Sequence, residues 1–364
     1  MYNIFLLKSL IYIAPDFFPE RKANSIHVEN QVRSLAGKGV YVYLIFKSRS
    51  GEKSFLFDRN VFEIPIKLPR AKRSNLFFLI ALVRRLELLR KFPILTRSRT
   101  SILLAAFPYF KHRIIFEAHE PLKSGWLKQL VKSRKIPILA ISCALKRIIE
   151  SELKDALKIY VQHDASNLEI LEKSRLDFPS KVKAVYVGSI GPGRGIELIL
   201  KLAERMSEIE FHLIGDIDES NTKVELVNVK FHGWKCKKEI VSIVKVADVL
   251  LAPYQRDLIL DNGLCTIDYM SPLKIFEYMS YNVPMIVSDF PVIREVLING
   301  FDAILIDPDN FEQWKSSIEL LISDQELSNF LSRNALRKLE SEFTWDKRSD
   351  SIIEIFNDEC GCFS

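Results

Sequence analysis

A glycine-rich segment follows the hydrophobic run at 183–187 and could bind an anion. Glycines occupy positions 188, 191, 193 and 195, and an amphipathic helical pattern begins directly after them. Glycines let backbone N–H groups approach a ligand closely, and a helix N-terminus adds partial positive charge. Arg194 adds a planar guanidinium that suits phosphate oxygens. The spacing fits neither a Walker A loop nor the standard dinucleotide motif, so an ordinary strand–helix turn with a surface arginine stays open.

A second segment, residues 271–289, combines a cation and a carboxylate at helical spacing. Pro272 suits a first helical turn, because its missing N–H would have no partner there. Lys274 lies in that turn, where the helix dipole favours anions, so a bound anion would explain this cation. Glu277 follows on the same helical face and could accept both hydroxyls of a ribose. The two residues describe a nucleotide-diphosphate pocket, with a surface Lys–Glu pair as the alternative.

The elements that would position these residues alternate between short hydrophobic runs and helical patterns. Strand candidates are 10–14, 40–46, 113–118 and 136–142 in the first half, with a helix near 25–38, and 183–187, 210–215, 229–233, 248–253, 284–288 and 303–306 in the second half. This alternation predicts βαβ units and parallel sheets. In such sheets ligands bind at the carboxyl ends of the strands.

The length of 364 residues predicts about two domains. A polar, proline-containing segment at 173–181 is the predicted linker. We therefore predict an N-terminal domain over 1–172 and a C-terminal domain over 182–345. Both are expected to be doubly wound and Rossmann-like and to face each other across a cleft. A helix at about 346–360 is expected to pack back on the first domain.

Composition excludes several classes of protein. Five cysteines without metal-ligand spacing argue against a disulfide scaffold and against a zinc site. The longest uninterrupted apolar run, 76–83, is too short for a membrane span. Lys8 interrupts the apolar N-terminus and no basic region precedes it, which disfavours a signal peptide. These features predict a cytoplasmic protein.

Charge divides unevenly along the chain. Residues 1–175 contain 32 Lys and Arg against 15 Asp and Glu, whereas residues 176–364 contain 20 against 31. The first half is therefore expected to face an anionic partner or surface. Ten basic residues and one acidic residue lie between Lys67 and Arg99. The hydrophobic stretch 75–92 within that range predicts a helix that either lies on an anionic membrane or packs in the core with a solvated basic end.

Several segments, in their order and spacing, resemble the family 4 retaining glycosyltransferases (glycosyl transferases group 1), which have the GT-B fold. They are VGSIGPGRGIELIL, FHLIGD, VKFHGW, ADVLLAPY, SPLKIFEYM, VPMIVSDFPVIREVL and DAILIDPDN, and they cover nearly all of 183–345. The resemblance is looser in the first half. There ANSIHVENQVRSLAGKG resembles the family's first helix, FEAHEP its inter-domain histidine loop, and AISCALKR and VQHDASN its last strands.

The resemblance implies that the domain over 1–172 binds the acceptor and that the domain over 182–345 binds the nucleotide sugar. It also implies a role for each matching residue. Arg194 and Lys274 would neutralise the donor diphosphate, Glu277 would hold the ribose hydroxyls, and His119 would reach the transferred sugar. The implied catalytic set is therefore His119, Arg194 and Lys274. The remaining implied positions are Ser189, Trp234, Ser271, Pro272 and Leu273 for donor binding, and Asn24 and Ser25 on the acceptor side.

Some of these assignments have simple alternatives. Trp234, implied to line the base pocket, could be a core or surface side chain, and His119 could be a hydrogen-bonded loop histidine. Asn24 and Ser25 could cap the helix that follows them. The family's Glu-x7-Glu motif would put its first glutamate at Tyr269, and Asp268 lies one position out of register. The transferred sugar is therefore left open.

The resemblance implies retaining, metal-independent transfer of a sugar from a donor that is most often UDP- or GDP-linked, without a further cofactor. The implied acceptor is a cell-surface polysaccharide, a lipopolysaccharide or a lipid-linked glycan, at the inner face of the cytoplasmic membrane. Two alternatives are a nucleotide-sugar epimerase of the same fold, for which no convincing acid–base set is evident, and a non-enzymatic basic binding protein. No nucleic-acid motif supports a nucleic-acid partner.

Overall fold

A computed structural model describes residues 7–18, 23–51, 59–69, 74–110, 113–154, 157–169, 181–216, 226–258 and 265–360. The chain divides into two compact units. The first unit comprises Met1–Asp164 and Trp345–Ser364, and the second comprises Ala165–Thr344. The linker predicted at 173–181 lies outside the described residues except for Lys181.

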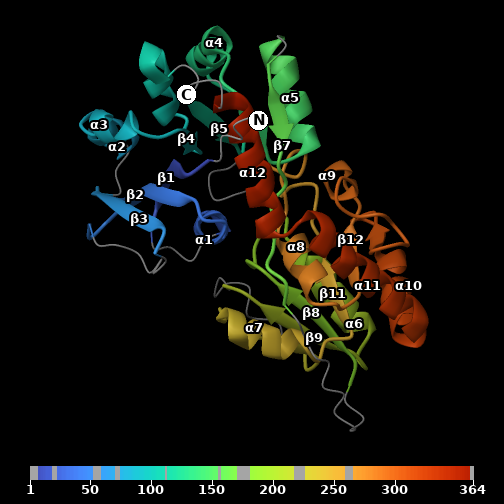
Figure 1. Cartoon of the computed structure of the whole chain (residues 1–364). Coiled ribbons are helices and arrows are strands. Elements are labelled where there is room, and N and C mark those ends of the chain that lie inside the picture. Colours follow the sequence, from blue (N-terminus) through green and yellow to red (C-terminus); the bar gives the residue numbers. More distant parts are fainter. Residues whose placement is uncertain are drawn as a thin grey trace, which may run out of the picture. The chain divides into compact units, whose positions relative to one another are not determined.

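The first unit is built on a parallel sheet (Figure 1) whose described strands follow the order β3-β2-β1-β4-β5-β6-β7. The strands are β1 (Ser9–Phe17), β2 (Tyr41–Ser48), β3 (Val61–Lys67), β4 (Ile94–Thr96), β5 (Ile114–Ala118), β6 (Ile138–Ala140) and β7 (Ile159–Val161). The α-helices are α1 (Ala23–Gly37), α2 (Ser74–Val83), α3 (Leu86–Leu89), α4 (Gly125–Arg134), α5 (Cys143–Leu153) and α12 (Trp345–Cys360), and the 3-10 helices are η1 (Ser101–Ala106) and η2 (Pro108–Phe110).

Two helices from opposite ends of the chain share one hydrophobic core with this sheet. Val28, Val32 and Leu35 recur at helical spacing on α1 and are buried, as expected for a helix with one apolar face. Ile352 and Phe356 of α12 are buried in the same cluster. The last helix of the chain is therefore part of the first unit.

The second unit contains a parallel sheet whose described strands follow the order β10-β9-β8-β11-β12-β13 (Figure 1). The strands are β8 (Lys183–Val187), β9 (Glu210–Ile214), β10 (Val229–Phe231), β11 (Val249–Ala252), β12 (Met285–Ser288) and β13 (Ile304–Ile306). The helices are α6 (Ile196–Arg205), α7 (Lys237–Val244), α8 (Leu273–Ser280), α9 (Pro291–Arg294), α10 (Phe311–Ser323) and α11 (Gln325–Glu342).

Both sheets reverse their strand order once, which confirms the predicted doubly wound class. The reversal lies between β1 and β4 in the first sheet and between β8 and β11 in the second. In open parallel sheets, ligands bind outside the carboxyl ends of the strands at this switch point. Each unit therefore has one edge where a binding site is expected.

Several elements differ from the sequence-based expectations. Strand β3 was not expected from the sequence, because its Pro65 disfavours a central strand. Proline is tolerated here because β3 lies at the edge of the sheet. The stretch 75–92 forms two helices, α2 and α3, rather than one. The segment AISCALKR was expected to be a strand, but after Ala140 it turns into α5.

Candidate functional site

The switch point of the second unit is lined by the predicted glycine-rich loop. This loop connects β8 to α6, and Gly195 is the residue just before the helix, with φ of +75°. A Cβ atom at Gly195 would lie 1.8 Å from the carbonyl oxygen of Pro253, which follows β11. The loop can therefore pack against the end of β11 only with glycine at this position.

Helix α8 is anchored to the same two strands by Tyr278. The Tyr278 hydroxyl accepts a hydrogen bond from the Val187 N–H at 2.8 Å and donates to the Leu251 carbonyl at 3.1 Å. Val187 ends β8 and Leu251 lies in β11. These contacts hold the N-terminus of α8 beside the glycine-rich loop. The sequence suggested that Pro272 lies within the first turn of this helix, but it directly precedes the helix.

Lys274 projects from this N-terminus toward the glycine-rich loop. Its Cε atom lies 2.7 Å from where a Cβ at Gly188 would be, and its ammonium lies 3.7 Å from the ring centroid of Tyr186. Burial and then the neighbouring Arg194 lower the pKa of Lys274 well below its usual value, against the opposite effect of Glu277. Over the described ranges, neither Lys274 nor Arg194 forms an ion pair. The switch point therefore brings together two repelling cations.

Glu277 lies one turn further along α8, between two cations. Lys237, the first residue of α7, places its ammonium 4.0 Å from the Glu277 carboxylate and donates a hydrogen bond to the Tyr281 hydroxyl at 3.0 Å. Burial raises the pKa of Glu277, although Lys237 and Lys274 act to lower it. The Lys274–Glu277 ion pair that the sequence left open is not formed among the described residues. Glu277 is paired with Lys237 instead, a residue that the sequence did not indicate.

The other predicted donor-side residues lie on three connections. Ser189 is an exposed residue of the glycine-rich loop, and its carbonyl accepts a hydrogen bond from the Tyr186 hydroxyl. Ser271 is buried and Leu273 half-buried at the start of α8. Trp234 is exposed in the connection from β10 to α7, three residues before Lys237.

The two positions at the altered glutamate motif differ in exposure. Tyr269 is buried, and Asp268 is exposed. Neither therefore places a carboxylate in a buried position where the family motif has its first glutamate.

Residues at the switch point of the first unit converge on Arg97, which directly follows β4. Its guanidinium donates to the carbonyl of Asn24 at 3.3 Å and to its side-chain oxygen at 3.5 Å. Asn24 and Ser25 lie inside the first turn of α1, not ahead of it, so they are not its N-cap. The Ser25 hydroxyl is buried and makes no hydrogen bond within the described parts of the chain. Arg97 itself was not among the predicted site residues.

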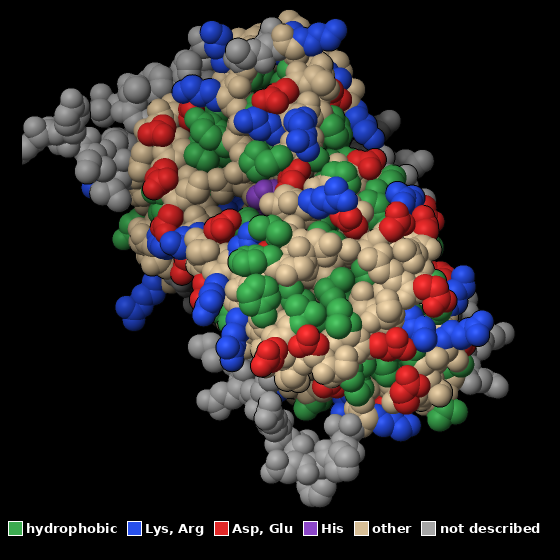
Figure 2. All heavy atoms as spheres, turned by 90° about the vertical axis from the view of Figure 1, so that its right-hand side faces the viewer, with side chains coloured by type: hydrophobic (Ala, Val, Ile, Leu, Met, Phe, Trp, Pro, Cys, Tyr) green, Lys and Arg blue, Asp and Glu red, His purple; other side chains and the backbone are tan. Residues whose placement is uncertain are grey.

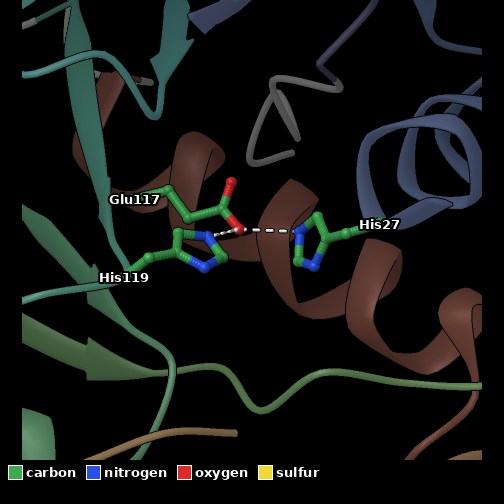
Figure 3. A group of neighbouring side chains, drawn as sticks. All are labelled: His27, Glu117 and His119. Carbon is green, nitrogen blue, oxygen red and sulfur yellow. Dashed lines mark hydrogen bonds and ion pairs between the residues drawn. The ribbon is translucent and has the colours of Figure 1, made fainter. Parts of the chain in front are cut away.

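His119 belongs to a buried group of polar side chains (Figure 3). Its Nε2 lies 3.1 Å from Oε1 of Glu117, the penultimate residue of β5. His27 of α1 points at the same carboxylate, with Nε2 2.9 Å from Oε1, and its Nδ1 lies 2.8 Å from Asp164. The Nδ1 atom of His119 lies 3.3 Å from the Arg97 guanidinium. His119 is thus a hydrogen-bonded histidine, and it keeps about a quarter of its side chain exposed.

The charges of this group set its protonation. Burial alone would raise the pKa of Glu117, but Arg348 and His27 outweigh it and hold that pKa well below its usual range. Burial and Arg97 lower the pKa of His119 to about 4, although Glu117 acts in the opposite direction. At neutral pH the group therefore contains an ionised carboxylate and a neutral His119.

His27, Glu117 and His119 also approach one another closely enough to bracket a metal ion. However, Glu117 Oε1 already accepts a hydrogen bond from Arg348 at 2.8 Å, and Arg97 contacts His119. A divalent cation would lie beside two guanidinium groups, which is electrostatically unfavourable. The arrangement fits a hydrogen-bonded histidine network better than a metal centre.

The residues that the sequence analysis missed have weak local signals. Glu117 lies two positions before His119 in the quoted FEAHEP segment, and Tyr278 lies inside SPLKIFEYM. Arg97 was counted only among the basic residues of the surface stretch, yet it is buried. Its place directly after a strand could have indicated the switch point, had β4 been predicted.

The basic stretch from 67 to 99 is divided between surface and interior. Arg84, Arg90 and Lys91 are exposed, while residues 70, 72 and 73 lie outside the described residues. Along α2, four hydrophobic side chains are 40–52% exposed: Leu76, Phe77, Ile80 and Val83. Their spacing places them on one side of the helix. The expectation of a core helix accounts only for the buried Phe78 and Leu82.

Two further observations concern the surface. On the face drawn in Figure 2, basic and acidic side chains are interspersed with hydrophobic ones, so its described side chains form no large patch of a single charge. Among the described helices, none is long and hydrophobic enough to cross a bilayer.

The chain is similar to several known proteins. The chain is 22% identical over 244 residues to an uncharacterised glycosyltransferase of Methanocaldococcus jannaschii, an alignment covering 65% of this chain and 64% of the relative. It is 25% identical over 187 residues to the UDP-Gal:alpha-D-GlcNAc-diphosphoundecaprenol alpha-1,3-galactosyltransferase of Escherichia coli, covering 51% of this chain and 43% of the relative. The chain thus aligns with less than two thirds of either relative.

A solved structure and a family match extend the comparison. The structure of HepE from Anabaena, in complex with UDP and glucose, covers 96% of this chain and all of its own, with a TM-score of 0.69 and 12% identity; this likeness concerns the fold. Residues 169–338 match the family described as Glycosyl transferases group 1, and this range takes in most of the second unit with its switch point. The second unit is therefore similar, over most of its length, to the glycosyl transferases group 1 family.

Proposed function

We propose that this protein transfers a sugar from a nucleoside-diphosphate donor to a glycan acceptor, and that the donor diphosphate binds at the switch point of the second unit. The observation that carries the proposal is the pair of cations there, Arg194 and Lys274, of which Arg194, after burial, lowers the pKa of Lys274 in the free protein. A bound dianion would relieve this repulsion. A nucleoside diphosphate supplies that charge and offers a ribose to Glu277.

The proposed chemistry follows from charge. Breaking the anomeric bond leaves negative charge on the diphosphate and positive character on the sugar. Arg194, Lys274 and the N-terminus of α8 would stabilise the leaving group, as preorganised cations and dipoles do in other transferases. We propose that the reaction retains the anomeric configuration, with the leaving phosphate accepting the proton of the acceptor hydroxyl. This route requires no enzyme nucleophile and no metal ion.

His119 of the first unit is proposed to contact the transferred sugar. As a neutral ring it can accept a hydrogen bond from a sugar hydroxyl at Nδ1, the nitrogen that now faces Arg97. Asn24, which contacts the same guanidinium, and Ser25, which follows it in α1, are proposed to contact the acceptor. The buried Ser25 hydroxyl without a hydrogen-bond partner among the described residues suits such a contact.

The acceptor class is proposed from the relatives. The galactosyltransferase of Escherichia coli is named for a diphosphoundecaprenol-linked acceptor. A lipid-linked or lipopolysaccharide-type acceptor at the inner face of the cytoplasmic membrane would suit a protein that binds the membrane surface. UDP-linked and GDP-linked sugars are the proposed donors.

A donor screen by mass spectrometry tests the proposed activity. The protein is incubated with a panel of UDP-, GDP- and ADP-sugars, and the slow release of free nucleoside diphosphate is measured. We expect release from one UDP- or GDP-sugar, and about 30- to 1000-fold slower release by the Arg194→Ala variant, because a lost charge contact to the leaving group costs about 2–4 kcal/mol. Equal release by Arg194→Ala would rule out the proposed diphosphate site.

Membrane binding is proposed to use α2. The exposed apolar side of α2 offers hydrophobic area that a membrane could bury. Arg84 at the end of α2, and Arg90 and Lys91 after α3, add positive charge for anionic headgroups. We expect the protein to sediment with anionic vesicles at 0.1 M salt. Binding should weaken toward 1 M, as the Debye length falls from about 10 Å to about 3 Å.

Two variants distinguish membrane binding through α2 from nonspecific hydrophobic adsorption. Replacing Phe77 and Ile80 with Ser should abolish sedimentation with anionic vesicles. Replacing Leu320, a similarly exposed leucine on α10 of the second unit, should leave it unchanged. A wild-type protein that fails to bind anionic vesicles at low salt would contradict the membrane proposal.

A further inference from the structure

Arg348 connects the last helix to the histidine group of the first unit. Its side chain is buried, and its three nitrogens donate to acceptors from three places in the chain. Nε donates to the His163 carbonyl at 2.9 Å, Nη2 donates to Glu117 Oε1 at 2.8 Å, and Nη1 donates to the side-chain oxygen of Gln31 on α1. A guanidinium is the side chain that can satisfy three such acceptors at once.

The partners of His119 decide which of its nitrogens carries a proton. A guanidinium only donates, so His119 Nδ1, 3.3 Å from Arg97, must accept. An ionised carboxylate only accepts, so Nε2, 3.1 Å from Glu117 Oε1, must donate. The network therefore selects the neutral ring with its proton on Nε2. A sugar hydroxyl could therefore donate to Nδ1 only by replacing the Arg97 guanidinium there.

Charge on Glu117 would by itself favour a second proton on His119. The opposing groups around the ring are Arg97 and, at a centroid distance of 5.2 Å, His27. Arg348 acts through the carboxylate, because it binds the same Oε1 atom that faces His119. On the other carboxylate oxygen, Oε2, Tyr12 donates a hydrogen bond at 2.8 Å.

We propose that Arg348 is a positioning residue that, by binding Glu117, keeps His119 neutral and protonated on Nε2. The last helix would thus set the hydrogen-bonding state of a histidine 229 positions earlier in the chain. The assignment of His119 as a sugar-contacting residue rests on the proposed function. The protonation state of the ring does not.

Nitrogen NMR of histidine-labelled protein, without donor or acceptor, tests this directly. The chain has six histidines, so the His119 signal is identified by its loss in a His119→Asn variant. The wild-type ring should show the neutral Nε2-protonated pattern from pH 8 down to pH 5. In Arg348→Met the pKa of His119 should rise by about 1 unit or more, because an unneutralised carboxylate in contact favours the charged ring.

Two further variants separate this role from a structural one. Lys347→Met removes a neighbouring exposed charge on α12 and should leave the His119 titration as in the wild type. The double variant Arg348→Met/Glu117→Gln removes both charges and should bring the titration back down, which general loosening of the fold would not do. With a transfer assay in hand, Arg348→Met should show an acid-side loss of kcat that the wild type lacks.

Several results would overturn the proposal. They are a wild-type His119 that is protonated at pH 6, a wild-type ring protonated on Nδ1, an Arg348→Met titration equal to that of the wild type, or a double variant that titrates like the single one. If Arg348→Met does not fold, the wild-type spectrum still decides whether His119 is neutral and protonated on Nε2. Since no substrate is present, a failed transfer assay would contradict the proposed function and leave this result standing.

Discussion

Replacing Lys274 with Met should affect stability and nucleotide binding in opposite directions. In the free protein this ammonium is half-buried, lies against the Tyr186 ring and faces the Arg194 guanidinium. Methionine has a similar length and can pack on the same ring without a charge. The substitution therefore removes an unfavourable buried charge from the free protein, and it removes the ammonium's contact with the diphosphate from the complex.

The magnitudes follow from the charge state. The lowered pKa of Lys274 means that the charged ammonium is disfavoured in the folded protein at pH 7, so the variant should have a higher free energy of unfolding than the wild type. Loss of a charge-assisted contact to the diphosphate costs about 1.5–3 kcal/mol, or about 10- to 150-fold in Kd.

The pH dependence gives a second check on the sign. The pKa of Lys274 is lower in the folded protein than in the unfolded chain, so the unfolded chain holds this proton more tightly. Wild-type stability should therefore rise as the pH increases from the lowered pKa toward about 10.4, and Lys274→Met should lose that contribution.

Thermal unfolding at pH 7 and pH 9, in buffer free of phosphate, measures the stability part. Calorimetry with UDP and GDP measures the binding part. Lys201→Met, which removes an exposed lysine on α6, is the matched control and should change neither. A Lys274→Met variant that is less stable than the wild type and binds nucleotide equally well would refute the reasoning, because Lys274 would then have a structural role.

Three other predictions concern the same sites. Glu277→Gln should weaken nucleotide binding by about 1.5–3 kcal/mol in calorimetry, and wild-type affinity should fall as the pH drops through the raised pKa of Glu277; unchanged affinity would make this residue structural. Gly195→Ala should lower Tm strongly and reduce expression, because its Cβ would clash with the Pro253 carbonyl, whereas Gly191→Ala has open space and should behave like the wild type. His119→Asn should reduce the rate of sugar transfer far more than it reduces the affinity for free UDP or GDP. An equal loss of both would contradict the proposal that His119 contacts the transferred sugar.

The sequence predicted the elements at the switch point of the second unit because their signals are local. Glycines, a proline before a helix, and short hydrophobic runs each indicate one element, and βαβ succession places the carboxyl ends of β8 and β11 together. The loop around Gly195 and the start of α8 were therefore expected near each other before any coordinates. Lys237 was missed because α7, which follows β10 in the sequence, carries no recognisable motif.

The network of the first unit could not be predicted in the same way. Arg348 and Glu117 are 231 positions apart, and no local pattern links them. His27 reads as an ordinary helix residue until α12 and Asp164 are placed beside it. The edge strand β3 was hidden by Pro65, and the very short β4 concealed the position of Arg97 at a strand end.

Hydrogen–deuterium exchange with and without a nucleoside diphosphate tests the central claim most directly. The claim is that the diphosphate binds at the switch point of the second unit, between the glycine-rich loop and α8. Saturating UDP or GDP should slow exchange in peptides covering 188–196 and 271–280, and the Lys274→Met variant should lose this protection. Protection confined to the first unit, or no protection by any nucleoside diphosphate, would contradict the account.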